Sequence, residues 1–187
     1  PFYDAGDGIN FRDYIYAYGF RYAGGGGIRQ SDGQYFFVEN GPGTDRLARL
    51  VSGRNYGFNG SDESMYTFAS YNWVPATAPV DIAFVEAGVY NNSGFPAQYA
   101  NRAYVTQSGA TWASGPGTDL EKVVTEFTLA SDGTRVGGPR PIAIYNGFGK
   151  SSASAMAVGP DGIYFCDLYT EAAFDNPTAR GSSIIKL

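Results

Sequence analysis

Short runs of alternating apolar and polar residues, separated by glycine, proline and aspartate turns, recur along the whole chain. The run at 122–129 alternates cleanly between the two kinds of side chain. A period of two predicts strands, and turns at strand-length intervals are typical of sandwiches, barrels and propellers. The expected strands are 12–20, 34–39, 47–51, 82–90, 102–107, 122–129, 142–145, 155–158, 163–167 and 183–187. No segment shows a convincing helix pattern, and 59–80 is expected to be irregular.

The stretch 35–58 contains the first candidate for chemistry. A strand ends there in a turn at 40–43, and the return strand follows. The carbonyls of Gly41 and Pro42, flanked by Glu39 and Asp45, are oxygen donors of the kind that calcium selects. A plain hairpin connection with solvated acids explains the same residues, because such turns are common in all-β proteins.

Two short motifs occur twice and indicate a repeated architecture. GPGTD stands at 41–45 and 115–119, and Asp-Gly-x-Tyr-Phe stands at 32–36 and 161–165. Repeated hairpin signatures favour β-propeller blades, which are antiparallel four-stranded sheets around an axis. We expect one partial propeller over 1–187, with blade-like units at about 11–58, 80–148 and 152–187. About three blades leave open edges, which need the remainder of the propeller, further copies or other chains to pair with them.

The composition supports an all-β fold and excludes several function classes. The 187 residues include 26 glycines and 16% aromatic residues, but only 17% charged residues. A net charge of −5 without a basic run predicts no nucleic-acid partner, and no apolar run approaches the ~18 residues of a membrane span. The four glycines at 24–27 have no side chain to pack, and they lack the Lys-Ser/Thr sequence of a phosphate cradle. No signal peptide is recognised, and a start at Pro1 suggests a processed chain or a fragment.

Histidine is absent from the sequence, and Cys166 is the single cysteine. This composition removes the commonest general base, every Ser-His or Cys-His arrangement, an intrachain disulfide and a cysteine zinc cluster. We expect Cys166 to be a buried, inert thiol in an apolar strand. Two sequons, at Asn59 and Asn91, predict glycosylation and, with the low charge, an extracellular protein.

A series of longer motifs follows along the chain: IYAYGFR at 15–21, ENGP with Asp45 at 39–45, GRNYGF at 53–58, GFP at 94–96 with Tyr99, Tyr104 and Val105, KVV at 122–124, VGPDGIY at 158–164 with Asp167, and IIKL at 184–187. In this order the motifs resemble the C-terminal half of the pyrroloquinoline quinone-dependent glucose/sorbosone dehydrogenase family, whose fold is a six-bladed β-propeller. The resemblance covers nearly the whole chain.

The resemblance implies a quinone and calcium site that this sequence matches unevenly. Gly41 and Pro42 would supply the calcium carbonyls, and Arg21 would reach the quinone. The acid pair of the family is Asp45-Arg46 here, so that one carboxylate has become a cation, which disfavours calcium. The family's Arg-Asn-Pro becomes Arg21-Tyr22 without the proline, and 150–154 replaces its Gly-Arg-Pro. The catalytic histidine belongs to the family's N-terminal half.

Three functions follow as alternatives. The favoured one is a degenerate, non-catalytic propeller segment that serves as a structural subunit of an extracellular assembly, with its calcium and quinone lost. The second is the C-terminal half of an active quinone- and calcium-dependent sugar dehydrogenase. The third is a carbohydrate-binding module that uses exposed aromatic faces. The candidate stacking residues are Tyr14, Tyr16, Trp73 and Trp112.

Overall fold

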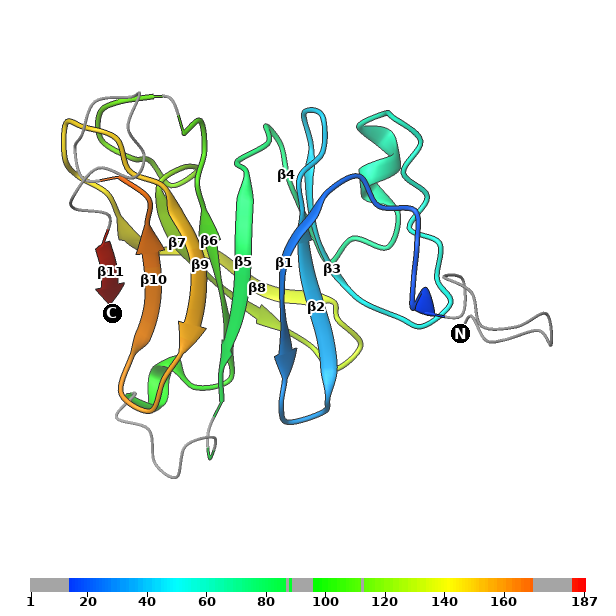
Figure 1. The fold of residues 1–187 in the computed structure, drawn as a ribbon. Coiled ribbons are helices and arrows are strands. Elements are labelled where there is room, and N and C mark those ends of the chain that lie inside the picture. The colour runs from blue at the N-terminus through cyan, green and yellow to red at the C-terminus, as the bar shows by residue number, and fades with distance from the viewer. Residues whose placement is uncertain (1–13, 87, 89–95, 112, 170–182) are drawn as a thin grey trace.

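The computed structural model describes residues 14–86, 88, 96–111, 113–169 and 183–187, and within them the protein is all-β. The strands form three antiparallel sheets, as predicted (Figure 1). The structure includes two short 3-10 turns, η2 at Glu63–Tyr66 and η3 at Ala97–Tyr99. No helix among the described residues has the length and apolarity needed to cross a membrane.

The three sheets follow one another along the chain. The first sheet has the order β1 (Ala23–Arg29), β2 (Gln34–Glu39), β3 (Asp45–Arg49) and β4 (Tyr71–Trp73). The second has the order β5 (Pro79–Val85), β6 (Arg102–Gln107), β7 (Val123–Leu129) and β8 (Arg135–Ile144). The third contains β9 (Ala153–Val158), β10 (Ile163–Asp167) and β11 (Ser183–Lys186), with β10 in the middle. Among the described residues the third sheet therefore has three strands rather than the expected four.

The repeated motifs lie at equivalent places in successive sheets. Both Asp-Gly-x-Tyr-Phe copies join the first strand of a sheet to its second, between β1 and β2 and between β9 and β10. Both GPGTD copies lie between the second and third strands, before β3 and before β7. The sequence repeat is therefore a repeat of the hairpin connections, as the blade prediction required.

The sheets pack face to face, with their first strands next to one another (Figure 1). Strand β5 contacts both β1 and β9. One core cluster, which includes Phe36, Trp73 and Phe127, joins the first and second sheets. Another, which includes Tyr104, Ile163 and Phe165, joins the second and third sheets. The second sheet is thus covered on both faces, whereas the first and third sheets each have one face directed away from the stack.

The glycine run at 24–27 is part of strand β1, a role that the sequence analysis did not assign to it. A Cβ atom on Gly25 would lie 2.2 Å from the Val80 carbonyl oxygen, and one on Gly27 would lie 2.5 Å from that of Ile82. Both glycines therefore let the backbones of β1 and β5 approach more closely than any side chain allows. The first two sheets can therefore pack closely at their inner strands because these glycines have no side chains.

The carboxylate of Asp81 links the inner strands of all three sheets. Its Oδ1 accepts a hydrogen bond from Ile82 N at 2.9 Å, and its Oδ2 accepts one from Met156 N in β9 at 2.9 Å. The N–H of Gly26 in β1 also donates to it. Burial raises the pKa of Asp81 above its ordinary value, although these bonds oppose the shift.

This raised pKa makes a prediction about the pH dependence of stability. The native state holds the Asp81 proton more tightly than the unfolded chain, so the contribution of Asp81 to the unfolding free energy is largest below the unfolded pKa and falls as the pH rises through the folded pKa. An Asp81→Asn variant lacks this loss. Urea titrations between about pH 3.5 and 7 should show the native protein losing stability relative to the variant as the pH rises, and a constant difference would contradict the prediction.

Three expectations about local structure, and the bounds of the first blade-like unit, differ from the structure. The described part of the expected strand at 12–20 is not a strand. Its pairing is an isolated bridge between Tyr18 and Asn55, because the segment packs beside the first sheet instead of joining it. The irregular stretch 59–80 contains β4, which pairs with β3. Cys166 is half-buried rather than buried, because it points to the face of β10 that is directed away from the second sheet. The first sheet spans 23–73, later than the unit placed at 11–58.

Candidate functional site

The turn between β2 and β3 holds a buried ion pair. The register of the two strands places Glu39 opposite Arg46, and both side chains are fully buried. Arg46 Nε and Nη2 donate to Glu39 Oε2 at 3.0 and 2.5 Å. The Arg46 guanidinium therefore neutralises Glu39, one of the two carboxylates that the sequence analysis placed beside a possible calcium site.

Arg46 has further partners that fix its position. Its Nη1 donates to the carbonyl oxygens of Tyr56 at 3.0 Å and Thr67 at 2.7 Å. Glu39 Oε1 accepts a short hydrogen bond from the Arg21 backbone N–H. Because the pair is bonded on all sides, it ties together strand β3, the loop at 50–58 and the segment after η2.

The Asp45 carboxylate is also committed to protein donors. Its Oδ1 accepts a hydrogen bond from Gly41 N at 2.9 Å, and its Oδ2 accepts bonds from Thr77 N at 2.6 Å and Ala78 N at 2.8 Å. Burial raises the pKa of Asp45, with the three backbone bonds acting in the opposite direction. Asp45 thereby closes its own turn and holds the connection from β4 to β5.

The donor set around Gly41 and Pro42 does not fit a resident calcium ion. Glu39 and Asp45 are occupied as described, and Asp62 Oδ1 accepts a hydrogen bond from Gly43 N at 2.7 Å. Asn40 Oδ1 is a buried oxygen of the same turn without a hydrogen-bond partner. Calcium needs six to eight oxygen ligands, usually with several carboxylates. Within the described part of the chain, no group of three or more acidic or other metal-binding side chains comes together. The involvement of the Gly41 and Pro42 carbonyls stays a prediction from the family resemblance.

Arg21 lies directly beside this turn. Its side chain is exposed, and its Nη1 donates to the Asn40 carbonyl oxygen at 2.9 Å. The backbone of the neighbouring Tyr22 accepts a bond from Asn40 N at 3.0 Å. The fold thus brings Arg21 and the Gly41-Pro42 turn together, as the resemblance implied, while its role toward a quinone remains a prediction.

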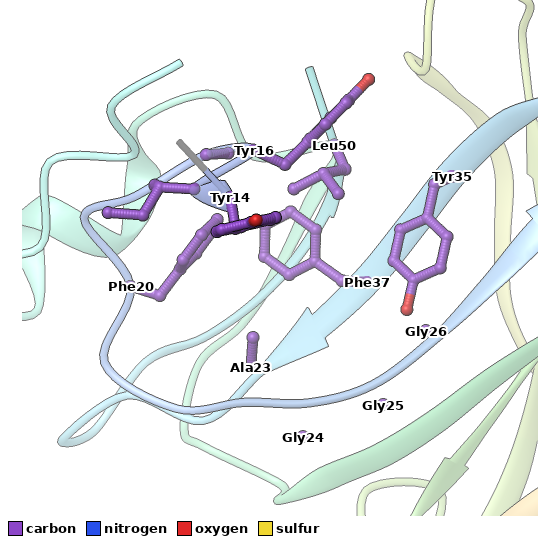
Figure 2. A pocket seen from close by; sticks show the side chains of 12 residues that line it. Tyr14, Tyr16, Phe20, Ala23, Gly24, Gly25, Gly26, Tyr35, Phe37 and Leu50 are labelled. Carbon is purple, nitrogen blue, oxygen red and sulfur yellow. The ribbon is translucent and has the colours of Figure 1, made fainter. Parts of the chain in front are cut away.

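A separate aromatic hollow opens on the face of the first sheet that is directed away from the second sheet (Figure 2). Its volume is about 440 Å³. Tyr14, Phe20 and Phe37 gather on one side, and Tyr35 lies on the other above Gly26. Tyr14 is 74% exposed and Tyr16 is 56% exposed. None of the lining residues carries a charge at neutral pH.

The hollow includes only two of the four aromatic residues proposed for sugar stacking. Tyr14 and Tyr16 line it. Trp73 is 2% exposed, and its ring packs against Tyr71 and Phe127, so it is a core residue and offers no face to a sugar. Trp112 lies outside the described residues.

Sequence reasoning missed two features of this region. In the sequence, the only signal of the Glu39–Arg46 pair is that the two residues have opposite charges and lie on either side of a turn. The register of β2 and β3 must be known before the two side chains can be recognised as partners. Tyr35 was placed in a strand but not at a site, because its contact with Gly26 joins residues of neighbouring strands. Alternation of β2 showed which residues share a face, but not which face is covered.

Comparison with solved structures identifies the fold. The chain is similar to a glucose dehydrogenase, with TM-score 0.56 and 18% identity over 89% of this chain and 42% of that one. It is also similar to the PQQ-bound form of aldose sugar dehydrogenase from Streptomyces coelicolor, with TM-score 0.59 and 17% identity over 97% and 47%. A Thermus thermophilus protein described as a putative oxidoreductase (glucose dehydrogenase) matches with TM-score 0.57 and 20% identity over 99% and 49%.

These similarities confirm the expected partial propeller. The chain spans less than half the length of the solved structures that it matches, and its three sheets correspond to part of the propeller-type fold. At this level of identity the similarity concerns the fold alone. A scan of protein-family models and a search of curated proteins gave no match to the sequence.

Proposed function

We propose that this chain is a non-catalytic segment of a sugar-dehydrogenase-like propeller that acts as a structural subunit of an extracellular assembly. The observation that carries the proposal is the Glu39–Arg46 pair, because it puts a buried guanidinium where the resemblance implies a calcium-side acid. The chain also contains no histidine to take a proton from a sugar hydroxyl. The outward-directed faces of the first and third sheets suit a part that becomes complete by packing on further blades.

A second candidate is that the chain forms the C-terminal half of an active quinone-dependent sugar dehydrogenase. The exposed Arg21 beside the Gly41-Pro42 turn and the PQQ-bound aldose sugar dehydrogenase among the similar structures favour it. In that case Arg21 would hold the quinone, which accepts hydride when bound. The residues of this chain would then position the cofactor, and the proton acceptor would have to come from outside it.

The two candidates are separated by titrating the protein with pyrroloquinoline quinone in the presence and absence of calcium. The structural proposal predicts no saturable, calcium-dependent quinone binding and no dye reduction with aldose sugars. An Arg21→Ala variant is the control, since the Arg21 side chain is exposed and we expect the variant to keep the fold. Saturable, calcium-dependent quinone binding that disappears in Arg21→Ala would overturn the structural proposal in favour of the dehydrogenase.

The extracellular location makes its own prediction at the first sequon. Asn59 is exposed, with its Oδ1 accepting a bond from Ser61 N at 3.1 Å, whereas Asn91 lies outside the described residues. After expression through a eukaryotic secretory pathway, we expect endoglycosidase to lower the mass of the protein, and Asn59→Gln to remove one glycan. Secretion without any such mass loss would contradict glycosylation at this site.

A further inference from the structure

The dipeptide Asn-Gly occurs three times in the chain, at 40–41, 59–60 and 146–147. In this dipeptide the glycine backbone nitrogen can attack the side-chain amide carbon of the asparagine, because glycine has no Cβ to hinder the approach and its backbone is mobile. The new C–N bond closes a succinimide ring, and the side-chain amide nitrogen leaves as ammonia. Water then opens the ring to aspartate or isoaspartate, so the reaction needs no co-reactant besides solvent.

The fold decides which of these dipeptides can react. The attack requires an accessible asparagine amide, a glycine N–H that no acceptor holds, and a backbone with room to move. A hydrogen bond from the glycine nitrogen opposes the attack, because this bond must break before the nitrogen can turn toward the amide carbon. Differences in reactivity between identical dipeptides of one chain therefore come from their surroundings.

The dipeptide Asn40-Gly41 is held in place at the turn between β2 and β3. Gly41 N donates to the Asp45 carboxylate at 2.9 Å, and Asn40 N donates to the Tyr22 carbonyl oxygen at 3.0 Å. A Cβ atom on Gly41 would collide with the Thr44 carbonyl oxygen, so the turn is tightly closed. The Oδ1 atom of the Asn40 amide is buried. This arrangement opposes the attack at Asn40.

The dipeptide Asn59-Gly60 lies open in the loop before η2. Both residues are exposed, and a Cβ atom on Gly60 would meet no atom beyond its chain neighbours within 4 Å. Among the described residues, the Gly60 N–H has no hydrogen-bond acceptor. Asn59 Oδ1 accepts a hydrogen bond from Ser61 N at 3.1 Å, which folds the side chain over the Gly60 peptide and draws electron density from the amide carbon. The conditions for the attack are therefore met at Asn59.

We propose that Asn59 is a deamidation site of the folded chain when it carries no glycan, and that the fold protects Asn40. A glycan at Asn59 is attached to the same amide nitrogen that leaves in this reaction, so glycosylation and deamidation exclude one another there. The isoaspartate product lengthens the main chain shortly before Asp62. Because Asp62 Oδ1 accepts a hydrogen bond from Gly43 N at 2.7 Å, the altered loop adjoins the turn between β2 and β3.

The test follows the purified 187-residue chain, made without glycans in a bacterial host, during incubation in mildly alkaline buffer. Tandem mass spectrometry of tryptic peptides measures aspartate and isoaspartate at each asparagine over time. Conversion at Asn59 should be faster than at Asn40 by about tenfold or more, since the attack at Asn40 must first break a hydrogen bond to a buried carboxylate. Asn146 is exposed as well, and its conversion is followed separately in the same digest.

Two controls show whether the fold and the glycine cause the difference. In concentrated urea the conversion rates at Asn40 and Asn59 should become similar, because the dipeptide is the same and the Gly41–Asp45 hydrogen bond is lost. Gly60→Ala should slow conversion at Asn59 several-fold and leave Asn40 unchanged, since the added methyl group hinders the attack. This variant keeps the sequon of Asn59 and Ser61, and its circular dichroism spectrum should match that of the native protein.

Three results would overturn the proposal. The first is an unchanged Asn59 in the folded protein over a period that converts it in urea. The second is equal conversion of Asn40 and Asn59 in the folded protein, or a difference that persists in urea, since protection would then not come from the fold. The third is a Gly60→Ala variant that converts at the native rate. The inference stands on exposure and hydrogen bonding alone, so it and the proposed function fail separately.

Discussion

Replacing Arg46 with methionine is expected to lower the free energy of unfolding by about 3–5 kcal/mol, because the Glu39 carboxylate stays buried without its cation. The Tyr56 and Thr67 carbonyls lose their donor in the same variant. For a chain of this size the melting temperature should fall by roughly 10 °C. Urea unfolding followed by circular dichroism measures the change.

Two further variants show whether the effect belongs to the ion pair. Arg54→Met removes a cation that lies 4.2 Å from the Phe68 ring centroid at a partly exposed position, and it should cost no more than about 1 kcal/mol. In the double variant Glu39→Leu with Arg46→Met, both charges disappear, and much of the lost stability should return. A double variant no more stable than Arg46→Met would contradict the assignment of the loss to an unpaired Glu39.

Replacing Gly25 with alanine should destabilise the protein by about 1–3 kcal/mol, an effect far larger than expected for one added methyl group. The new Cβ would lie 2.2 Å from the Val80 carbonyl oxygen and 2.7 Å from Asp81 Cα, both of which belong to the backbone of β5 and cannot rotate away. The inner strands of the first two sheets must therefore separate. The measurement is again the free energy of unfolding in urea.

The matched control is Gly24→Ala in the same strand. Its Cβ would first meet the ring of the exposed Tyr22, at 3.3 Å, which has room to move. Alanine also restricts the unfolded chain, so this variant should be neutral or gain up to about 1 kcal/mol. If both variants lost the same free energy of unfolding, alanine would be unfavourable throughout β1, and the loss could not be assigned to the close contact between β1 and β5.

The buried charges at the turn between β2 and β3 also bear on function. The Glu39–Arg46 pair and the bonds of Asp45 give structural roles to side chains that a calcium site would need as ligands. Removing one member of such a buried pair leaves an uncompensated charge, so these side chains are committed to holding the turn. Restoring an acid with Arg46→Asp would place a second carboxylate beside Glu39, but two carboxylates alone fall short of the six to eight oxygen ligands that calcium takes.

The sequence alone determined the all-β class, most strand positions and the hairpin repeat. The bounds of β6 and β10 agree with the predicted 102–107 and 163–167, because alternation and turn residues are local signals. The Asp32-Gly33 motif marked its turn for the same reason, with Gly33 at positive φ. The family resemblance added the propeller, which the solved structures confirm as the fold.

Only the tertiary structure decided what these strands do to one another. The glycines of β1 became a close contact because β5 lies against them, and Trp73 became a core residue because the second sheet covers it. Glu39 and Arg46 became partners through the register of β2 and β3. Each of these outcomes depends on distances between segments far apart in sequence or on a register. A local pattern of apolar and polar residues fixes the side of a strand that is buried, but not the neighbour that buries it.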